Sequence, residues 1–250
     1  MPSACSGKPS CSAWQLYMSD TSRPLDPSTG TDAALRPASA MKYITFYLDF
    51  ISPYAWLAFQ KLPETLLGHS YSVRYKPILL AALLKHHGQL GPAEMPAKRD
   101  WTYRQVGWLA HSQGLELQLP ASHPFNPLGL LRLALACDAE GLPNRYVCES
   151  VFRHVWRGGA EAADPARLQT LTAQLAPARA VGSDEVKAQL KAHTDEAIEL
   201  GVFGVPTFAV DGKLFWGFDA LPMLQAYLSG DPWFESPWNA AASVAQGIRR

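Results

Sequence analysis

The sequence predicts a mixed α/β fold in which a small sheet, formed from two separated parts of the chain, carries a large all-helical insertion. An apolar run over residues 43–50 gives way to a helical pattern at Ser52 and Pro53, which predicts a strand followed by a helix. Far downstream, Asp211 and Gly212 separate two apolar runs, as in a β-hairpin. Helical periodicity dominates the residues between them. We assign the α/β domain to residues 41–80 and 201–230, and the helical subdomain to residues 81–200.

The first half of the predicted sheet is a strand over residues 43–50, a helix over 53–67 and a strand over 71–78. Ser52 is suited to cap the helix and Pro53 to begin it, because the hydroxyl can accept a backbone N–H and the ring presets φ. Capping alone is a sufficient reason for this pair. Pro63 removes one backbone hydrogen bond, so we expect a kink or an early stop near Leu62. A right-handed crossover places the two strands in parallel.

The helical insertion is predicted to contain five helices. Three tryptophans, Trp101, Trp108 and Trp156, occur at helical spacings typical of core-facing stripes. Lys98 and Arg99 open the first of these helices. Their predicted ranges are 100–114, 127–139, 144–156, 165–175 and 183–200.

The second half of the predicted sheet is a hairpin from Thr207 to Trp216. Pro206 has no N–H to give to a ladder, so it is expected at the beginning of the first strand. A closing helix is predicted over residues 219–228. Residues 231–250 are interpreted as a C-terminal tail that frays from Ala240 onward.

Composition favours a catalyst of small molecules. The chain has 250 residues, 48% of them hydrophobic, which is enough for a substantial core. Its 22 Lys and Arg equal its 22 Asp and Glu, so the formal net charge of +0 gives no overall attraction to nucleic acid or to an anionic membrane. No apolar run reaches the roughly 18–20 residues that cross a bilayer.

The first forty residues differ in composition from the rest. Pro, Ser, Thr, Ala and Gly dominate residues 1–40, so we expect this extension to be disordered, and it lacks the apolar region of a signal peptide. The four cysteines, Cys5, Cys11, Cys137 and Cys148, form no C-x-x-C pair and have no His pair at a zinc-like spacing. We therefore expect no bound metal, and free thiols in a reducing compartment, the cytoplasm.

Three motifs in order resemble those of a known family. They are residues 49–54 (Asp-Phe-Ile-Ser-Pro-Tyr), 203–207 (Phe-Gly-Val-Pro-Thr) and 216–219 (Trp-Gly-Phe-Asp). Over residues 41–228 the chain resembles the thioredoxin fold of the DsbA type, and within it the 2-hydroxychromene-2-carboxylate isomerases and the kappa-class glutathione transferases. Ser52 and Ala55 stand where disulfide-exchange enzymes have cysteines, which counts against disulfide exchange.

The resemblance implies a glutathione site. In this family the position of Ser52 holds the sulfur of glutathione, and the tripeptide backbone pairs with the residue before a cis proline, here Val205 before Pro206. The γ-glutamyl end is held by the turn Trp216, Gly217, Phe218 and Asp219, with Asp219 facing the ammonium. A serine hydroxyl and the positive end of a helix both favour a thiolate.

The resemblance also implies a reaction and a substrate. Reversible addition of the thiolate to a conjugated double bond would isomerise an aromatic keto acid, interconverting 2-hydroxychromene-2-carboxylate and trans-o-hydroxybenzylidenepyruvate. The candidates for binding the substrate carboxylate and the developing enolate are Lys85, Lys98, Arg99, His123 and Asn126.

Other interpretations of these residues stay open. Lys98 and Arg99 are more typical of a solvated helix end than of an anion site, and His86 and His87 more typical of a polar loop than of a base. Asp219 can be a helix cap and a ligand at once. A kappa-like transferase or peroxidase, and a non-catalytic or disulfide-exchange thioredoxin-fold protein, remain alternatives to the isomerase. Relatives of this type are usually homodimers, so a homodimer is expected here too.

Overall fold

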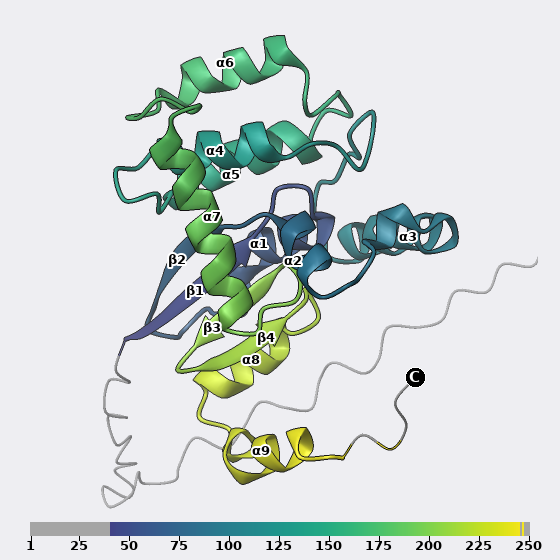
Figure 1. Ribbon diagram of the computed structural model, residues 1–250. Helices are drawn as coiled ribbons and strands as arrows, with labels where there is room; N and C mark the ends of the chain where they lie inside the picture. Colours follow the sequence, from purple (N-terminus) through teal and green to yellow (C-terminus); the bar gives the residue numbers. More distant parts are fainter. Residues whose placement is uncertain (1–40, 246, 248–250) are drawn as a thin grey trace, which may run out of the picture. The chain divides into compact units, whose positions relative to one another are not determined.

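The computed structural model describes residues 41–245 and 247. The predicted disorder of residues 1–40, together with Cys5 and Cys11, lies outside the described residues. Figure 1 shows a four-stranded sheet at the centre of the described part. Its strand order is β2-β1-β3-β4, with bounds Lys42–Leu48 for β1, Tyr71–Pro77 for β2, Thr207–Val210 for β3 and Lys213–Trp216 for β4.

The strand pairing confirms the prediction that the two halves of the chain share one sheet. β1 pairs with β2 in parallel, with Phe46 opposite Tyr75, and pairs with β3 antiparallel, with Phe46 opposite Phe208. β3 and β4 form the predicted hairpin. Asp211 and Gly212 at its turn have φ values of 48° and 75°, the left-handed conformation that a two-residue hairpin loop of type I′ requires.

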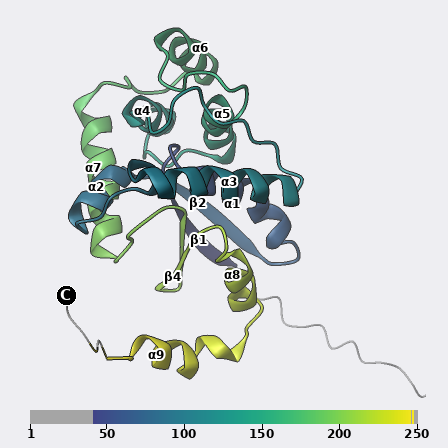
Figure 2. The same cartoon turned by 90° about the vertical axis from the view of Figure 1, so that its right-hand side faces the viewer.

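Helices cover both faces of the sheet (Figures 1 and 2). α1 (Pro53–Thr65) and α8 (Leu221–Leu228) pack on one face, where Trp56 and Phe59 join Phe208 in the main core. α2 (Leu80–His86) and α7 (Asp184–Glu199) pack on the other face. A second, smaller core lies there, made of Tyr47, Ile78, Leu83, Ala197, Val202 and Val205.

Several helices end or begin at other residues than predicted: α3 (Pro96–Ser112) begins four residues before its predicted start, and α4 (Leu128–Ala136) ends three residues before its predicted end. α1 continues through Pro63 for two residues and ends at Thr65, two residues before the predicted end. α8 begins at Leu221, two residues after the predicted start at Asp219. Asp219 therefore precedes the N-cap of α8, which is Ala220.

The remaining helices form a layer that rises from the edge of the sheet (Figure 1). α4 (Leu128–Ala136) and α5 (Arg145–Trp156) supply apolar side chains to the main core, and α6 (Pro165–Leu175) lies against both. α3 (Pro96–Ser112) follows a short 3-10 turn, η1 (Pro92–Glu94), and projects to the side of the sheet. The helix α2 falls outside the five predicted helices.

The prediction that Trp101 and Trp108 face the core is wrong, because their side chains are 64% and 63% exposed. The small residues Val106 and Ala110 make the buried contact of α3 instead. In a weakly amphipathic helix, the spacing of the apolar residues does not determine which face packs against the rest of the protein. Tertiary packing decides it. Trp156 of α5 is fully buried, as predicted.

The C-terminal segment is partly helical and not a tail throughout. A 3-10 turn, η2 (Pro232–Phe234), and α9 (Ser236–Ala242) follow α8. Phe234 is buried, with its ring 5.8 Å from that of Phe215 and 5.3 Å from that of Tyr227. Aromatic packing thus orders Phe234, which we interpret from the sequence as part of a tail.

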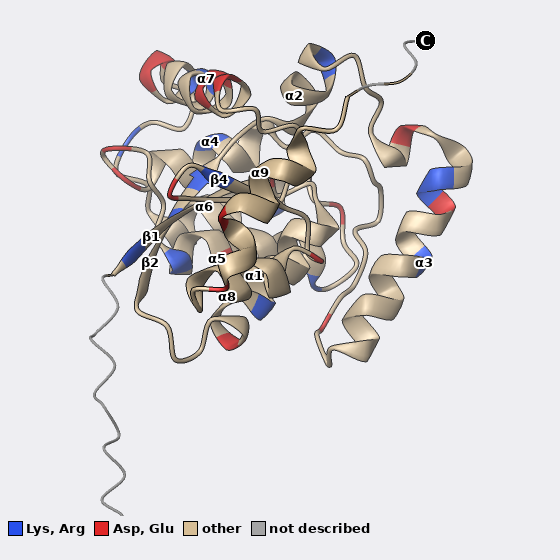
Figure 3. Cartoon of the chain, turned by 90° about the horizontal axis from the view of Figure 1, so that it is seen from below, with Lys and Arg blue, Asp and Glu red and all other residues tan. Residues whose placement is uncertain are grey.

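Figure 3 shows that the positions of Lys and Arg and of Asp and Glu are interspersed along the helices, strands and loops. None of the described helices is both long and apolar enough to cross a membrane.

Candidate functional site

The candidate site is built around Ser52, where β1 ends and α1 begins. Its Oγ accepts the Ala55 N–H at 3.2 Å, which caps the helix, and donates to the Val205 carbonyl at 3.3 Å. The Ser52 backbone is extended, with φ −88° and ψ 116°, as an N-cap requires. The side chain therefore joins the first helix to a loop 153 residues later in the chain.

The second part of the site is the loop that contains Val205 and Pro206. The peptide bond between these two residues is cis, as the sequence predicts. The Pro206 carbonyl accepts the Gly217 N–H at 2.9 Å, which places the turn after β4 beside this loop. The predicted residues Ser52, Val205, Pro206 and Gly217 are thus brought together.

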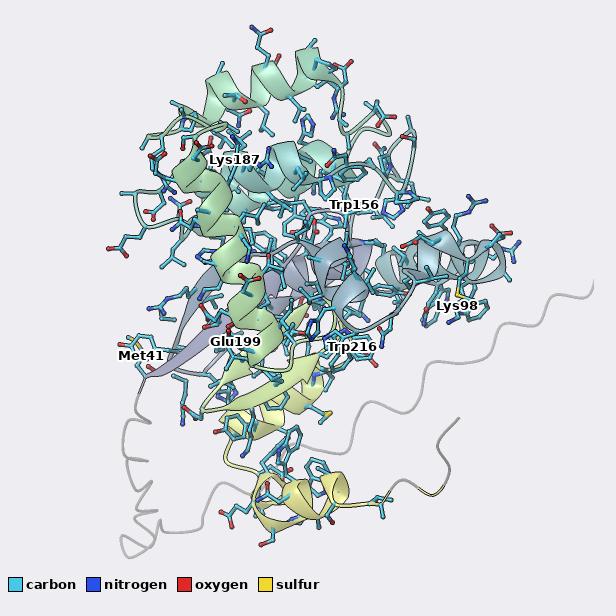
Figure 4. All side chains as sticks on the ribbon, in the orientation of Figure 1. Met41, Lys98, Trp156, Lys187, Glu199 and Trp216 are labelled. Atoms are coloured by element: carbon cyan, nitrogen blue, oxygen red, sulfur yellow. The ribbon has the colours of Figure 1, made fainter. Side chains whose placement is uncertain are left out.

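Trp216 packs on the glycine before Val205. A Cβ added at Gly204 would lie 2.6 Å from the Trp216 Nε1, so the indole rests directly on the backbone there. The Phe203 ring lies 4.8 Å from the Trp216 ring, and both side chains are partly exposed, at 40% and 52%. Figure 4 shows Trp216 at the end of β4. The loop therefore carries an exposed aromatic pair on its outer side.

Asp219 and Phe218 belong to the same turn. Asp219 is exposed, and its carboxylate lies against Gly217, whose φ of 102° favours glycine. Its negative charge also acts on Tyr54 in the first turn of α1: burial raises the pKa of the Tyr54 hydroxyl, and Asp219 raises it further. The Asp219 carboxylate therefore acts electrostatically on the Tyr54 hydroxyl.

Asp49 is a fully buried carboxylate directly before this junction. Its Oδ1 accepts the Ile51 N–H at 3.1 Å and its Oδ2 accepts the Leu80 N–H at 2.9 Å, at the start of α2. Burial raises the pKa of Asp49 to about 7, and the backbone donors oppose this rise. Asp49 thus fastens the Ser52 turn to α2.

His123 also reaches the junction. Its Nε2 lies 2.8 Å from the Ile51 carbonyl, and its Nδ1 lies 2.9 Å from the Tyr103 hydroxyl of α3. Burial lowers the pKa of the ring below its ordinary value. Of the predicted substrate-binding residues, His123 alone is connected to the Ser52 turn by hydrogen bonds in the described structure.

The other predicted substrate-binding residues make no described hydrogen bond or ion pair with this junction. Lys85, Lys98 and Asn126 are exposed, and no described hydrogen bond or ion pair joins any of them to Ser52 or Val205. The Asn126 Oδ1 accepts the N–H of Leu128, the first residue of α4, while the N-cap of that helix is Pro127. Figure 4 shows Lys98 in the first half of α3, beside Arg99, which pairs with Asp100 at 3.9 Å.

Three residues around Ser52 received no role from the sequence: Asp49, Tyr54 and Tyr103. The Tyr54 hydroxyl donates to the Gln105 Oε1 at 2.7 Å and so ties α1 to α3. The sequence did indicate that Asp49 is unusual, because a charged residue in an otherwise apolar strand must be paired or neutral when it is buried. Nothing in the sequence singled out Tyr103, since its hydrogen-bond partner, His123, is twenty residues further along the chain. Among the described residues, no group of three or more His, Cys, Asp or Glu could hold a metal ion.

A sheet of this order, with a cis proline loop opposite the start of the first helix and a helical insertion between its halves, defines a protein of the DsbA-like thioredoxin class. The family description "DSBA-like thioredoxin domain" matches residues 43–229, and the chain belongs to this family.

Within that class, the relatives are enzymes of two kinds. The chain is 30% identical over 197 residues to a 2-hydroxychromene-2-carboxylate isomerase of Pseudomonas sp. (strain C18), covering 76% of this chain and 91% of that protein. It is 27% identical over 217 residues to the glutathione S-transferase kappa 1 of Rattus norvegicus, covering 78% and 93%. A solved 2-hydroxychromene-2-carboxylate isomerase superposes with a TM-score of 0.66 at 25% identity, covering 81% of this chain and all of that one.

Proposed function

We propose that this protein is a glutathione-dependent isomerase that interconverts 2-hydroxychromene-2-carboxylate and trans-o-hydroxybenzylidenepyruvate. One observation carries the proposal: the Ser52 hydroxyl, buried at the N-terminus of α1, lies 3.3 Å from the backbone of the Val205-Pro206 loop. The named isomerases to which the chain is similar support the choice of reaction.

The residues of the site fit glutathione at two of its ends. The hydrogen bond from Ser52 to Val205 is long for O–H···O, so the hydroxyl can turn to a better acceptor at little cost. The exposed carboxylate of Asp219, in the turn whose Gly217 N–H bonds to the Pro206 carbonyl, suits an ammonium group. Trp216 and Phe218 precede Asp219 in the same turn and offer apolar surface to the tripeptide.

Glutathione, when bound, supplies a thiolate that adds reversibly to a conjugated double bond, so that the bond can rotate while it is single. The task of Ser52 is to hold that thiolate. A free thiol with a pKa of about 8.5 is only a few percent ionised at pH 7, and a fall of about two units makes the thiolate the major form. The donor hydroxyl and the positive end of the thirteen-residue α1 both act in this direction.

The substrate carboxylate needs a cation or an N–H group, and we assign this role to Lys85 and Lys98, with Asn126 as a polar contact. Both lysines are exposed and are free of ion pairs within the described structure, so neither is committed to another carboxylate. The aromatic pair of Phe203 and Trp216 offers a surface for the aromatic part of the substrate.

A kappa-class glutathione transferase or peroxidase is the second candidate function. The similarity to rat glutathione S-transferase kappa 1, which extends over 78% of this chain, favours it. The two functions need the same Ser52 and differ in stoichiometry, because an isomerase returns glutathione unchanged and a transferase or peroxidase consumes it.

The deciding experiment follows the interconversion of the two isomers by absorbance, with and without glutathione. We expect turnover only with glutathione, no net loss of it, and a fall of about a hundredfold in kcat/KM for Ser52→Ala, as for the loss of one hydrogen-bond donor to a developing anion. The control is Ser72→Ala, which changes an exposed serine on β2.

Two outcomes would decide against the isomerase. Turnover that is independent of glutathione would remove the cofactor from the proposal. Consumption of glutathione with a chloroarene or a peroxide, without isomerisation, would establish the transferase or peroxidase instead. We further propose a homodimer that works in the cytoplasm, where thiols are kept reduced, and sedimentation measurements test the dimer.

A further inference from the structure

Hydrogen bonds connect α3 to the backbone immediately before Ser52. The Tyr103 hydroxyl lies 2.9 Å from the His123 Nδ1 and 3.0 Å from the His123 carbonyl, and the His123 Nε2 lies 2.8 Å from the Ile51 carbonyl. Three aromatic rings surround the imidazole at centroid distances of 5.6 to 5.9 Å, those of Trp156, Tyr103 and Phe125. The ring is therefore held in one orientation.

The partners of His123 define its protonation state. A carbonyl can only accept, so Nε2 carries the proton and donates to Ile51. Nδ1 is then the unprotonated nitrogen, and it shares the single Tyr103 hydroxyl proton with the His123 carbonyl. The apolar surroundings, which lower the pKa of the ring, favour this neutral form. Both ring nitrogens are thus used, and the ring offers neither a positive charge nor a free lone pair to a substrate.

The hydrogen bond from His123 is one of two that hold the peptide group between Ile51 and Ser52. The peptide between Ile51 and Ser52 has its N–H bonded to the Asp49 carbonyl at 3.1 Å and its C=O bonded to the His123 Nε2. A peptide plane bonded at both its N–H and its C=O is restrained in its rotation, and this plane is one of the two that define the φ of Ser52. His123 therefore restrains the backbone that carries the Ser52 side chain.

We propose that His123, oriented by Tyr103, is a positioning residue that keeps the Ser52 hydroxyl aimed at the bound thiolate. This inference rests on the proposed function and changes the role that the sequence predicts for His123, from contact with the substrate to control of the hydroxyl. It also couples α3 to the site, because Tyr103 belongs to that helix.

The test compares two substitutions of the same histidine. His123→Gln keeps an N–H near the position of Nε2 and can still donate to Ile51, whereas His123→Leu keeps bulk but has no donor. Tyr103→Phe removes only the hydroxyl that orients the ring. Tyr43→Phe is the control, because Tyr43 is 72% exposed on β1.

The readout is the pKa of enzyme-bound glutathione, followed by the ultraviolet absorbance of the thiolate, together with its Kd and the melting temperature of the free protein. We expect His123→Leu to raise that thiol pKa by about one unit, which lowers the thiolate fraction at pH 7 about threefold, from about three quarters to about one quarter. Tyr103→Phe should raise it by less, while His123→Gln and Tyr43→Phe should leave it near the wild-type value.

The outcomes separate this inference from the proposed function. A lower melting temperature in His123→Leu with an unchanged thiol pKa would overturn the inference and leave His123 a packing residue. If His123→Leu does not fold, an unchanged thiol pKa in Tyr103→Phe has the same consequence. A wild-type protein that binds no glutathione would instead overturn the proposed function, and this inference with it.

Discussion

At the scale of single residues, Asp49 ties together segments that meet at Ser52. Its two carboxylate oxygens accept backbone N–H groups from the Ser52 turn and from the start of α2. The Asp49 side chain has no exposed surface, so the ionised carboxylate has a high free energy in the folded protein. Burial raises its pKa to about 7, well above the ordinary value of 3.8.

The raised pKa of Asp49 predicts a pH dependence of stability. A carboxyl that holds its proton more tightly when folded stabilises the fold at low pH, and this contribution is lost as the pH rises from about 4 to about 7. Asp49→Asn cannot titrate. The unfolding free energy of the wild type should therefore fall relative to that of Asp49→Asn as the pH rises over that interval. Urea unfolding at a series of pH values measures this.

A constant difference between the two proteins from pH 4 to pH 7 would show that Asp49 is already ionised at low pH in the folded state. Asp231→Asn serves as the control, because Asp231 is exposed and caps the η2 turn, far from Ser52 in sequence.

At the scale of elements, α7 is held on the sheet by a polar cluster. The Lys76 Nζ of β2 pairs with both carboxylate oxygens of Glu196, at 2.8 and 2.7 Å, and the Tyr47 hydroxyl of β1 donates to the same carboxylate at 3.0 Å. The Lys76 side chain is only 10% exposed. One acidic residue of α7 thus satisfies two buried donors of the sheet.

Removing that carboxylate leaves Lys76 poorly paired. We expect Glu196→Gln to lower the free energy of unfolding by about 1–3 kcal/mol, because the side chain of Lys76 cannot move freely into water. Glu199→Gln, three residues further along α7 and exposed, should change it by less than about 0.5 kcal/mol. Denaturant unfolding of both variants measures this, and equal effects would contradict the role of Glu196.

The helices and strands that could be predicted are those whose ends are set by residues at the ends themselves. Ser52 and Pro53 begin α1, and Asp211 and Gly212 turn the hairpin, because capping and turn conformations depend on the residues themselves. The exposure of Trp101 could not be predicted, since it depends on which side of α3 meets the body. Phe234 was missed for a related reason: its aromatic partners lie on other elements.

The candidate site shows the same division. Ser52 and Val205 were predicted as neighbours through motifs that occur at separate places in the chain, and the structure brings them within 3.3 Å. The contact of His123 with Ile51 joins residues 72 positions apart in sequence, with no motif to mark it. Contacts of this kind follow from the packing of α3 and the loop after it, and only the folded chain reveals them.

At the scale of the whole molecule, the described chain is a sheet split by a helical insertion, with the candidate site where the two halves meet. β1 and α1 come from before the insertion, and the Val205-Pro206 loop and the Gly217 turn come from after it. The start of α1 therefore faces a loop that reaches it only through folding. A site of this construction is suited to hold an extended tripeptide between its two sides.

The central claim is that glutathione lies across this junction with its thiolate at Ser52. The most direct test is a crystal structure of the protein grown with saturating glutathione. We predict the sulfur within hydrogen-bonding distance of the Ser52 Oγ, the tripeptide backbone along Val205 and the γ-glutamyl ammonium at Asp219. Glutathione bound elsewhere, or an empty junction at saturation, would contradict the claim.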